Sequence, residues 1–104
     1  MGKLIKVAEV NDVRPGAAKM IEADGHRIAL FNSGGVYYAI DDTCTHRGGA
    51  LSEGEMEGTV VTCPLHGASF DVTTGNVIGP PASERVASYR VQVDGDDITV
   101  ELPS

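Results

Sequence analysis

Four side chains of the kinds that bind transition metals stand in two closely spaced pairs near the middle of this sequence. Cys44 precedes His46 by two positions and Cys63 precedes His66 by three, with sixteen residues between the pairs. The chain has no other cysteine and one other histidine, His26. Thiolate and imidazole groups are the ligands that zinc and some iron–sulfur centres take in proteins. The pattern therefore predicts a closed metal site that is built from two loops.

Local geometry favours convergence of the ligands within each pair. Residues i and i+2 of an extended segment point to the same side, so the side chains of Cys44 and His46 converge. Pro64 begins a turn through which the side chains of the second pair converge as well. Glycine follows each pair directly and allows both a tight turn and a close approach of the backbone to a bulky cofactor. These glycines are Gly48, Gly49 and Gly67.

Three kinds of site suit two cysteines and two histidines. A tetrahedral zinc ion accepts this ligand set, although the C-x-H spacing is tight for one ion. A binuclear iron–sulfur cluster relaxes that constraint, because each loop then gives its cysteine to one iron and its histidine to the other. A disulfide between the cysteines is disfavoured in a reducing cytoplasm.

The elements that position these loops read as strands. Short alternating runs separated by Gly, Pro, Asn and Asp dominate the chain, which is typical of an all-β domain. Asp24-Gly25 predicts a hairpin turn, and the proline-containing stretch 73–82 predicts a turn and loop outside any central strand. We expect one domain over residues 1–104, in which a subdomain of about residues 41–81 is inserted into a β-sandwich or barrel. The predicted strands are 4–10, 18–23, 26–32, 36–40, 58–63, 69–72, 85–93 and 97–102.

Charge and hydropathy exclude two classes of partner. The formal net charge is −7, from 15 acidic and 8 basic residues, whereas phosphate binding needs clustered Lys and Arg. We therefore expect no nucleic acid partner. No apolar run approaches the roughly 20 residues of a membrane helix, and the N-terminus alternates like a strand, so we expect no membrane partner and a cytoplasmic location. Glu53, Glu55 and Glu57 either meet a basic docking partner or form a solvated hairpin.

The two pairs resemble the signature of Rieske ferredoxins, the small electron carriers of multicomponent aromatic-ring oxygenases. The family pattern is C-x-H, a gap of fifteen or more residues, and C-x-x-H. Further similarity lies in "CTHRGGALSEG", "CPLHGASFD", Thr74-Gly75 and "GPPA" at 79–82, which resembles the family's proline loop. The similarity extends over essentially the whole chain and implies the all-β Rieske fold.

This resemblance implies one 2Fe-2S cluster in the chain. Cys44 and Cys63 would hold the inner iron, and His46 and His66 would hold the outer iron near the surface, where electrons leave. Rieske oxygenases also need a mononuclear iron held by two histidines and a carboxylate, but only His26 remains here. The chain is therefore expected to be no enzyme and to have no catalytic residues. Catalysis would belong to a partner.

The implied function is single-electron transfer in aromatic hydrocarbon catabolism. The donor would be a flavin/NAD(P)H-dependent ferredoxin reductase, and the acceptor a terminal Rieske non-haem iron oxygenase. Contacts would be small and transient, and we expect the ferredoxin to be a monomer. The alternatives are a Rieske-type small subunit of an assimilatory nitrite reductase and a zinc-bound structural module.

Departures from the high-potential respiratory type predict a low reduction potential. That type has a disulfide between its two loops, whose positions match Gly49 and Leu65 here, so this bridge cannot form. Its Ser and Tyr hydroxyls, which donate to cluster sulfurs, match Ala68 and Phe70. Losing these donors destabilises the more negative reduced state, and nearby carboxylates act in the same direction. Proton-coupled behaviour should then appear only at alkaline pH.

Overall fold

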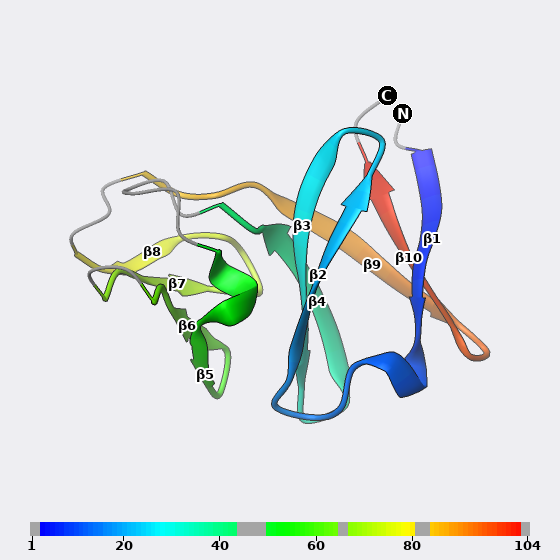
Figure 1. The fold of residues 1–104 in the computed structure, drawn as a ribbon, viewed down its shortest axis with the longest axis horizontal. Coiled ribbons are helices and arrows are strands. Elements are labelled where there is room, and N and C mark those ends of the chain that lie inside the picture. The colour runs from blue at the N-terminus through cyan, green and yellow to red at the C-terminus, as the bar shows by residue number, and fades with distance from the viewer. Residues whose placement is uncertain (1–2, 44–49, 65–66, 81–83, 103–104) are drawn as a thin grey trace.

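The structure, a computed structural model, describes residues 3–43, 50–64, 67–80 and 84–102. These residues form antiparallel strands and two short 3₁₀ helices, which confirms the all-β prediction (Figure 1). Across the described ranges no helix has the length and apolar character needed to span a membrane. The strands are β1 (Lys3–Glu9), β2 (Ala18–Ala23), β3 (His26–Ser33), β4 (Val36–Asp41), β5 (Glu55–Glu57), β6 (Val60–Thr62), β7 (Ser69–Asp71), β8 (Val77–Gly79), β9 (Ser88–Asp94) and β10 (Asp97–Leu102).

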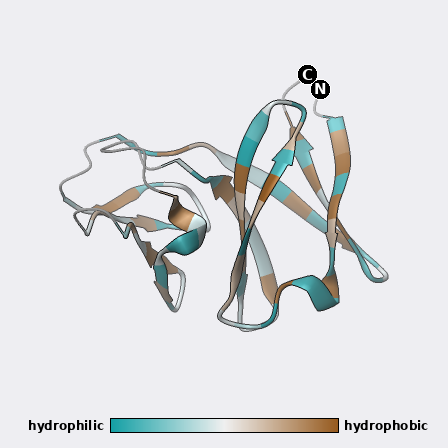
Figure 2. Ribbon diagram, viewed as in Figure 1, coloured by the Kyte–Doolittle hydropathy of each residue, from teal (hydrophilic) through white to brown (hydrophobic). Residues whose placement is uncertain are grey.

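Six strands form the large sheet, in the order β1-β10-β9-β4-β3-β2. The sheet curls until its edge strands β1 and β2 come into contact. Hydrophobic and hydrophilic segments alternate along its strands (Figure 2), as expected when one face is buried and the other is solvated. The hairpin turn between β2 and β3 is the predicted one, with Asp24 and Gly25 both at positive φ.

Strand β3 departs most clearly from this alternation, because both of its faces are buried. Ile28 and Leu30 face the interior of the curled large sheet. Ala29 and Phe31 point the other way and belong to a second core. A run of four apolar residues is the expected pattern for a strand that is covered on both sides.

The small sheet has the strand order β5-β6-β7-β8 and lies against the second face of the large sheet. It is preceded by the 3₁₀ helix η2 (Leu51–Glu53). Its buried side chains join Ala29, Phe31 and Ile40 of the large sheet in one apolar core. Those side chains are Leu51, Val61, Cys63, Ala68, Phe70, Val72 and Val86.

Several predicted boundaries were wrong, and β5 and β8 were not predicted as strands. The predicted strands 58–63 and 85–93 are β6 (Val60–Thr62) and β9 (Ser88–Asp94). The first strand ends at Glu9, because Val10 begins the 3₁₀ helix η1 (Val10–Asp12), which the Glu9 and Asp12 side chains cap reciprocally. Strand β8 lies within the stretch that was predicted to be only turn and loop. It is a three-residue edge strand that ends before Pro80, which agrees with the exclusion of a central strand there.

Candidate metal centre

Of the four predicted ligands, Cys63 lies among the described residues. Cys44, His46 and His66 lie outside them, as do Arg47, Gly48 and Gly49. Cys63 follows β6 directly and is 2% exposed, within the core between the two sheets. A metal bound through its sulfur would therefore be anchored on the protein side and not at the surface.

The second ligand loop is closed at its base by one short hydrogen bond. The Cys63 N–H donates to the Ala68 carbonyl at 2.6 Å. Between them, Gly67 has φ +77, and no other atom lies within 4 Å of the place where a Cβ would stand. The predicted tight turn after the C-x-x-H pair is thus confirmed at Gly67, since side chains rarely adopt this φ.

The first ligand loop is also closed at its base. Thr43 and Ala50 form an antiparallel bridge on either side of residues 44–49. Directly outside this bridge, the Leu51 N–H donates to the Asp42 carbonyl at 2.6 Å, and the Ser52 N–H donates to Asp42 Oδ1 at 2.8 Å. The two ends of the first ligand loop therefore lie side by side.

Both loop bases rest on the same apolar core. Leu51, from the first base, and Cys63 and Ala68, from the second, are all buried in the core that also holds Phe31 and Phe70. The two loops that contain the predicted ligands thus start from one apolar core, in which the Cys63 side chain is buried. This donor set fits a mixed thiolate–imidazole centre, and Cys63 would hold it from the interior.

The positions that matched hydroxyl donors in the high-potential type carry apolar side chains next to Cys63. Ala68 and Phe70 are both 0% exposed. Phe70 pairs across the small sheet with Val61, two residues before Cys63. Buried apolar side chains thus stand in place of both hydroxyls beside Cys63. Gly49 and Leu65, which match the disulfide positions of the high-potential type, lie outside the described residues.

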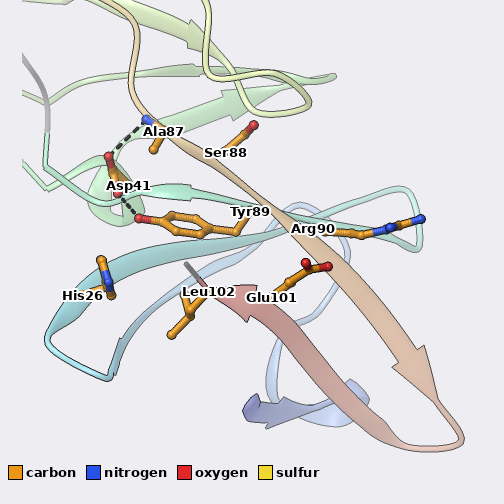
Figure 3. Close-up of a pocket in the computed structure, with 8 residues that line it drawn as sticks. All are labelled: His26, Asp41, Ala87, Ser88, Tyr89, Arg90, Glu101 and Leu102. Atoms are coloured by element: carbon orange, nitrogen blue, oxygen red, sulfur yellow. Dashed lines mark hydrogen bonds between the residues drawn. The ribbon is translucent and has the colours of Figure 1, made fainter. Parts of the chain in front are cut away.

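A hydrogen-bonded clamp holds the neck of the small sheet, where the chain leaves β4 and later returns to β9. Asp41 Oδ1 accepts from the Tyr89 hydroxyl at 2.5 Å, and Asp41 Oδ2 accepts from the Ala87 N–H at 3.0 Å (Figure 3). The Asp41 N–H donates to the Ala87 carbonyl at 2.9 Å. The clamp fixes the crossing directly before the first ligand loop.

The sequence analysis missed this clamp and the role of Asp42. His26 is half-buried, and its ring meets the Tyr89 ring edge-on at 6.1 Å between centroids. Both rings line an open pocket of about 730 Å³. The only sequence signal was the acidic pair Asp41-Asp42, which Thr43 separates from the C-x-H motif.

Tyr89→Phe should lower the unfolding free energy by about 1–3 kcal/mol at pH 7, because a charged acceptor loses its donor. Burial and the hydrogen bond to Asp41 raise the pKa of Tyr89 well above its ordinary value. The unfolded tyrosine ionises near pH 10, whereas the folded one keeps its proton, so wild-type stability falls as the pH rises above about 10. The variant lacks this decline. The difference in urea midpoint between the two proteins should therefore shrink from pH 8 to pH 11, and a constant difference would contradict the assignment.

The chain is similar to known proteins over most of its length. The family model for the Rieske [2Fe-2S] domain matches residues 3–90. The 3-phenylpropionate/cinnamic acid dioxygenase ferredoxin subunit of Shigella flexneri serotype 5b (strain 8401) is 44% identical over 100 residues, which are 95% of this chain and 93% of the relative.

Solved structures agree with these sequence matches. The ferredoxin of carbazole 1,9a-dioxygenase from Nocardioides aromaticivorans IC177 superposes with a TM-score of 0.93 at 31% identity, covering 97% of this chain and 99% of that one. A chain in the complex of reduced oxygenase and oxidized ferredoxin in carbazole 1,9a-dioxygenase superposes with a TM-score of 0.89 at 33% identity. The match covers 94% of this chain and 92% of that chain.

Proposed function

The chain belongs to the Rieske [2Fe-2S] domain family, and on this premise we propose that it is the ferredoxin of a multicomponent ring-hydroxylating oxygenase. It carries one 2Fe-2S cluster and transfers single electrons, and it is a carrier, not an enzyme. The observation that supports this most strongly is the 44% identity to a dioxygenase ferredoxin subunit over nearly the whole of both chains. The same relationship favours this role over that of a nitrite reductase small subunit.

Four residues are proposed to hold the cluster. Cys44 and Cys63 bind one iron, and His46 and His66 bind the other. When bound, the cluster accepts one electron and passes it on. Support comes from the spacing of the four residues and from the burial of Cys63 on a core that both loop bases share. The core keeps water from the thiolate side, and the closed loop bases keep the donors in place.

The proposed electron donor is a flavin- and NAD(P)H-dependent ferredoxin reductase, and the proposed acceptor is a terminal Rieske non-haem iron oxygenase. The acceptor is supported by the similarity to a chain in an oxygenase–ferredoxin complex. We further propose that residues 1–104 are one Rieske domain with a cluster-binding subdomain at about 41–81. It would act in the cytoplasm as a monomer that meets both partners in turn.

The test of this role is a complete electron-transfer cycle. The purified protein is mixed with NADH, a flavin-dependent ferredoxin reductase and a ring-hydroxylating oxygenase with its aromatic substrate. Its visible spectrum should bleach on addition of the reductase and recover when the oxygenase and substrate are added, with product formed. Product formation should cease without the ferredoxin. If the protein contains its cluster but is reduced and reoxidised by no pair of ferredoxin reductase and ring-hydroxylating oxygenase, the proposal is disproved.

The midpoint potential should lie at the low end of the range of about −150 to +300 mV that Rieske centres cover. It should also be flat between pH 6 and pH 8, because an electron-rich cluster leaves its imidazole protons weakly acidic. Ala68→Ser and Phe70→Tyr, which supply donors to the cluster sulfurs, should each raise the potential. A dye-mediated redox titration measures all three proteins. A steep pH dependence near neutrality in the wild type would contradict this account.

A further inference from the structure

We propose that Asp42 is a positioning residue of the metal centre and that its buried carboxylate lowers the reduction potential of the cluster. This inference rests on the proposed function, because it concerns the cluster that the ferredoxin carries. It assigns to one residue an effect that the sequence analysis attributed only to carboxylates in general.

The positioning role follows from the hydrogen bonds of Asp42. Its N–H donates to the Arg27 carbonyl of β3 at 3.0 Å, which ties the residue to the large sheet. Its carbonyl and its Oδ1 accept from the N–H groups of Leu51 and Ser52, at 2.6 and 2.8 Å. One residue thus joins the large sheet, the start of the first ligand loop and the end of that loop.

The charge of Asp42 lies where it acts strongly on the cluster. Asp42 is 4% exposed, and among the described residues it is one of two buried polar side chains, with Asn32. Two peptide units span at most about 7 Å, so covalent geometry keeps the Asp42 backbone close to Cys44. Arg27 and Asp42 line one surface pocket. The Arg27 guanidinium lies 3.9 Å from the Glu22 carboxylate, so the cation nearest to Asp42 in this pocket is paired with another acid.

The direction of the effect follows from Coulomb's law. Reduction adds one negative charge to the cluster, and a nearby carboxylate opposes that addition. The interaction is stronger in a protein interior than in water and is less screened by salt. Asp42 therefore favours the oxidised state and lowers the potential.

Asp41 provides a matched comparison. It has the same charge and adjoins Asp42, but it lies one residue farther from Cys44 and is more exposed. Its carboxylate is directed to Tyr89 and Ala87 at the neck. Removing its charge should therefore change the potential less than removing that of Asp42.

The experiment measures midpoint potentials of the holoprotein by dye-mediated titration at 50 mM and 500 mM salt. The variants are Asp42→Asn, Asp42→Glu and Asp41→Asn, each checked by electron paramagnetic resonance. Asp42→Asn keeps an oxygen that accepts from the Ser52 N–H and removes only the charge. We expect it to raise the equilibrium constant for reduction by about tenfold, which is about 59 mV for one electron. The shift should be similar at both salt concentrations, smaller in Asp41→Asn and absent in Asp42→Glu.

The outcomes separate this inference from the proposed function. A wild-type protein without a Rieske signal would disprove the function itself. Normal signals in all variants, with Asp42→Asn unshifted or shifted no more than Asp41→Asn, would disprove the inference and leave the function intact. Should Asp42→Asn assemble no cluster, Asp42→Ser offers a second neutral acceptor. If neither Asp42→Asn nor Asp42→Ser binds a cluster, the inference is also overturned, because it states that the charge of Asp42 changes the reduction potential and is not needed for cluster assembly.

Discussion

Replacing His46 or His66 with glutamine should abolish the 2Fe-2S centre, whereas His26→Gln should leave it intact. Glutamine keeps a polar side chain of similar length but has no imidazole nitrogen to bind iron. The two-loop account assigns every histidine except His26 to the cluster. We expect bound iron and acid-labile sulfide to fall at least about tenfold in the first two variants, in line with the dependence of metal sites on their full ligand set.

The measurement is iron and sulfide content with the visible spectrum, on proteins that are purified side by side. Circular dichroism distinguishes loss of the cluster from loss of the fold, because Cys63, the proposed ligand among the described residues, belongs to the core between the two sheets and not to the core inside the large sheet. His26→Gln is the matched control, since His26 is the one histidine outside the two Cys-His pairs and its ring contacts Tyr89. A full cluster in His46→Gln, or its loss in His26→Gln, would show that the ligand assignment is wrong.

Gly75→Ala is expected to be strongly destabilising, and more so than alanine at a glycine whose Cβ position is open. Gly75 has φ +81, and a Cβ there would overlap the carbonyl oxygen of Val86. That backbone cannot easily withdraw, because the Val86 N–H donates to the Gly75 carbonyl at 2.9 Å and Arg85 donates to the Thr74 carbonyl at 2.6 Å. Strain and overlap together should cost about 3–5 kcal/mol.

Gly95→Ala is the matched control for this prediction. Gly95 also has positive φ, +63, in the turn between β9 and β10, but nothing lies within 4 Å of its Cβ position. Backbone strain alone should cost about 1–2 kcal/mol there. Urea denaturation followed by circular dichroism compares the two variants. Equal losses would mean that the segment after the proline loop is not anchored on the turn at Gly75.

The large sheet was predictable because its signals are local. Alternating runs and the Asp24-Gly25 turn indicate its long strands and the reversal between β2 and β3, although the bounds of β1 and β9 differ from the prediction. The apolar run of β3 also follows from the sequence, although which core covers each face depends on the small sheet. Strands β5 and β8 are only three residues long, which is too short for an alternating hydrophobic pattern to predict a strand. They are strands because they pair with β6 and β7.

The proposed ligand set rests on a different kind of signal. Residue type and spacing carry the chemistry of Cys44, His46, Cys63 and His66, and the resemblance to a family supplied the cofactor. No comparable sequence pattern indicates the hydrogen bonds that support the site. Tyr89 and Asp41 are 48 positions apart, and only the register of β4 with β9 brings them together.

The most direct test of the central claim is electron paramagnetic resonance of the purified protein after reduction with dithionite. The account predicts a brown protein that gives a rhombic signal with an average g below that of four-cysteine ferredoxins, as mixed cysteine and histidine ligation requires. A colourless protein that contains zinc and gives no signal would contradict it and would identify the site as structural.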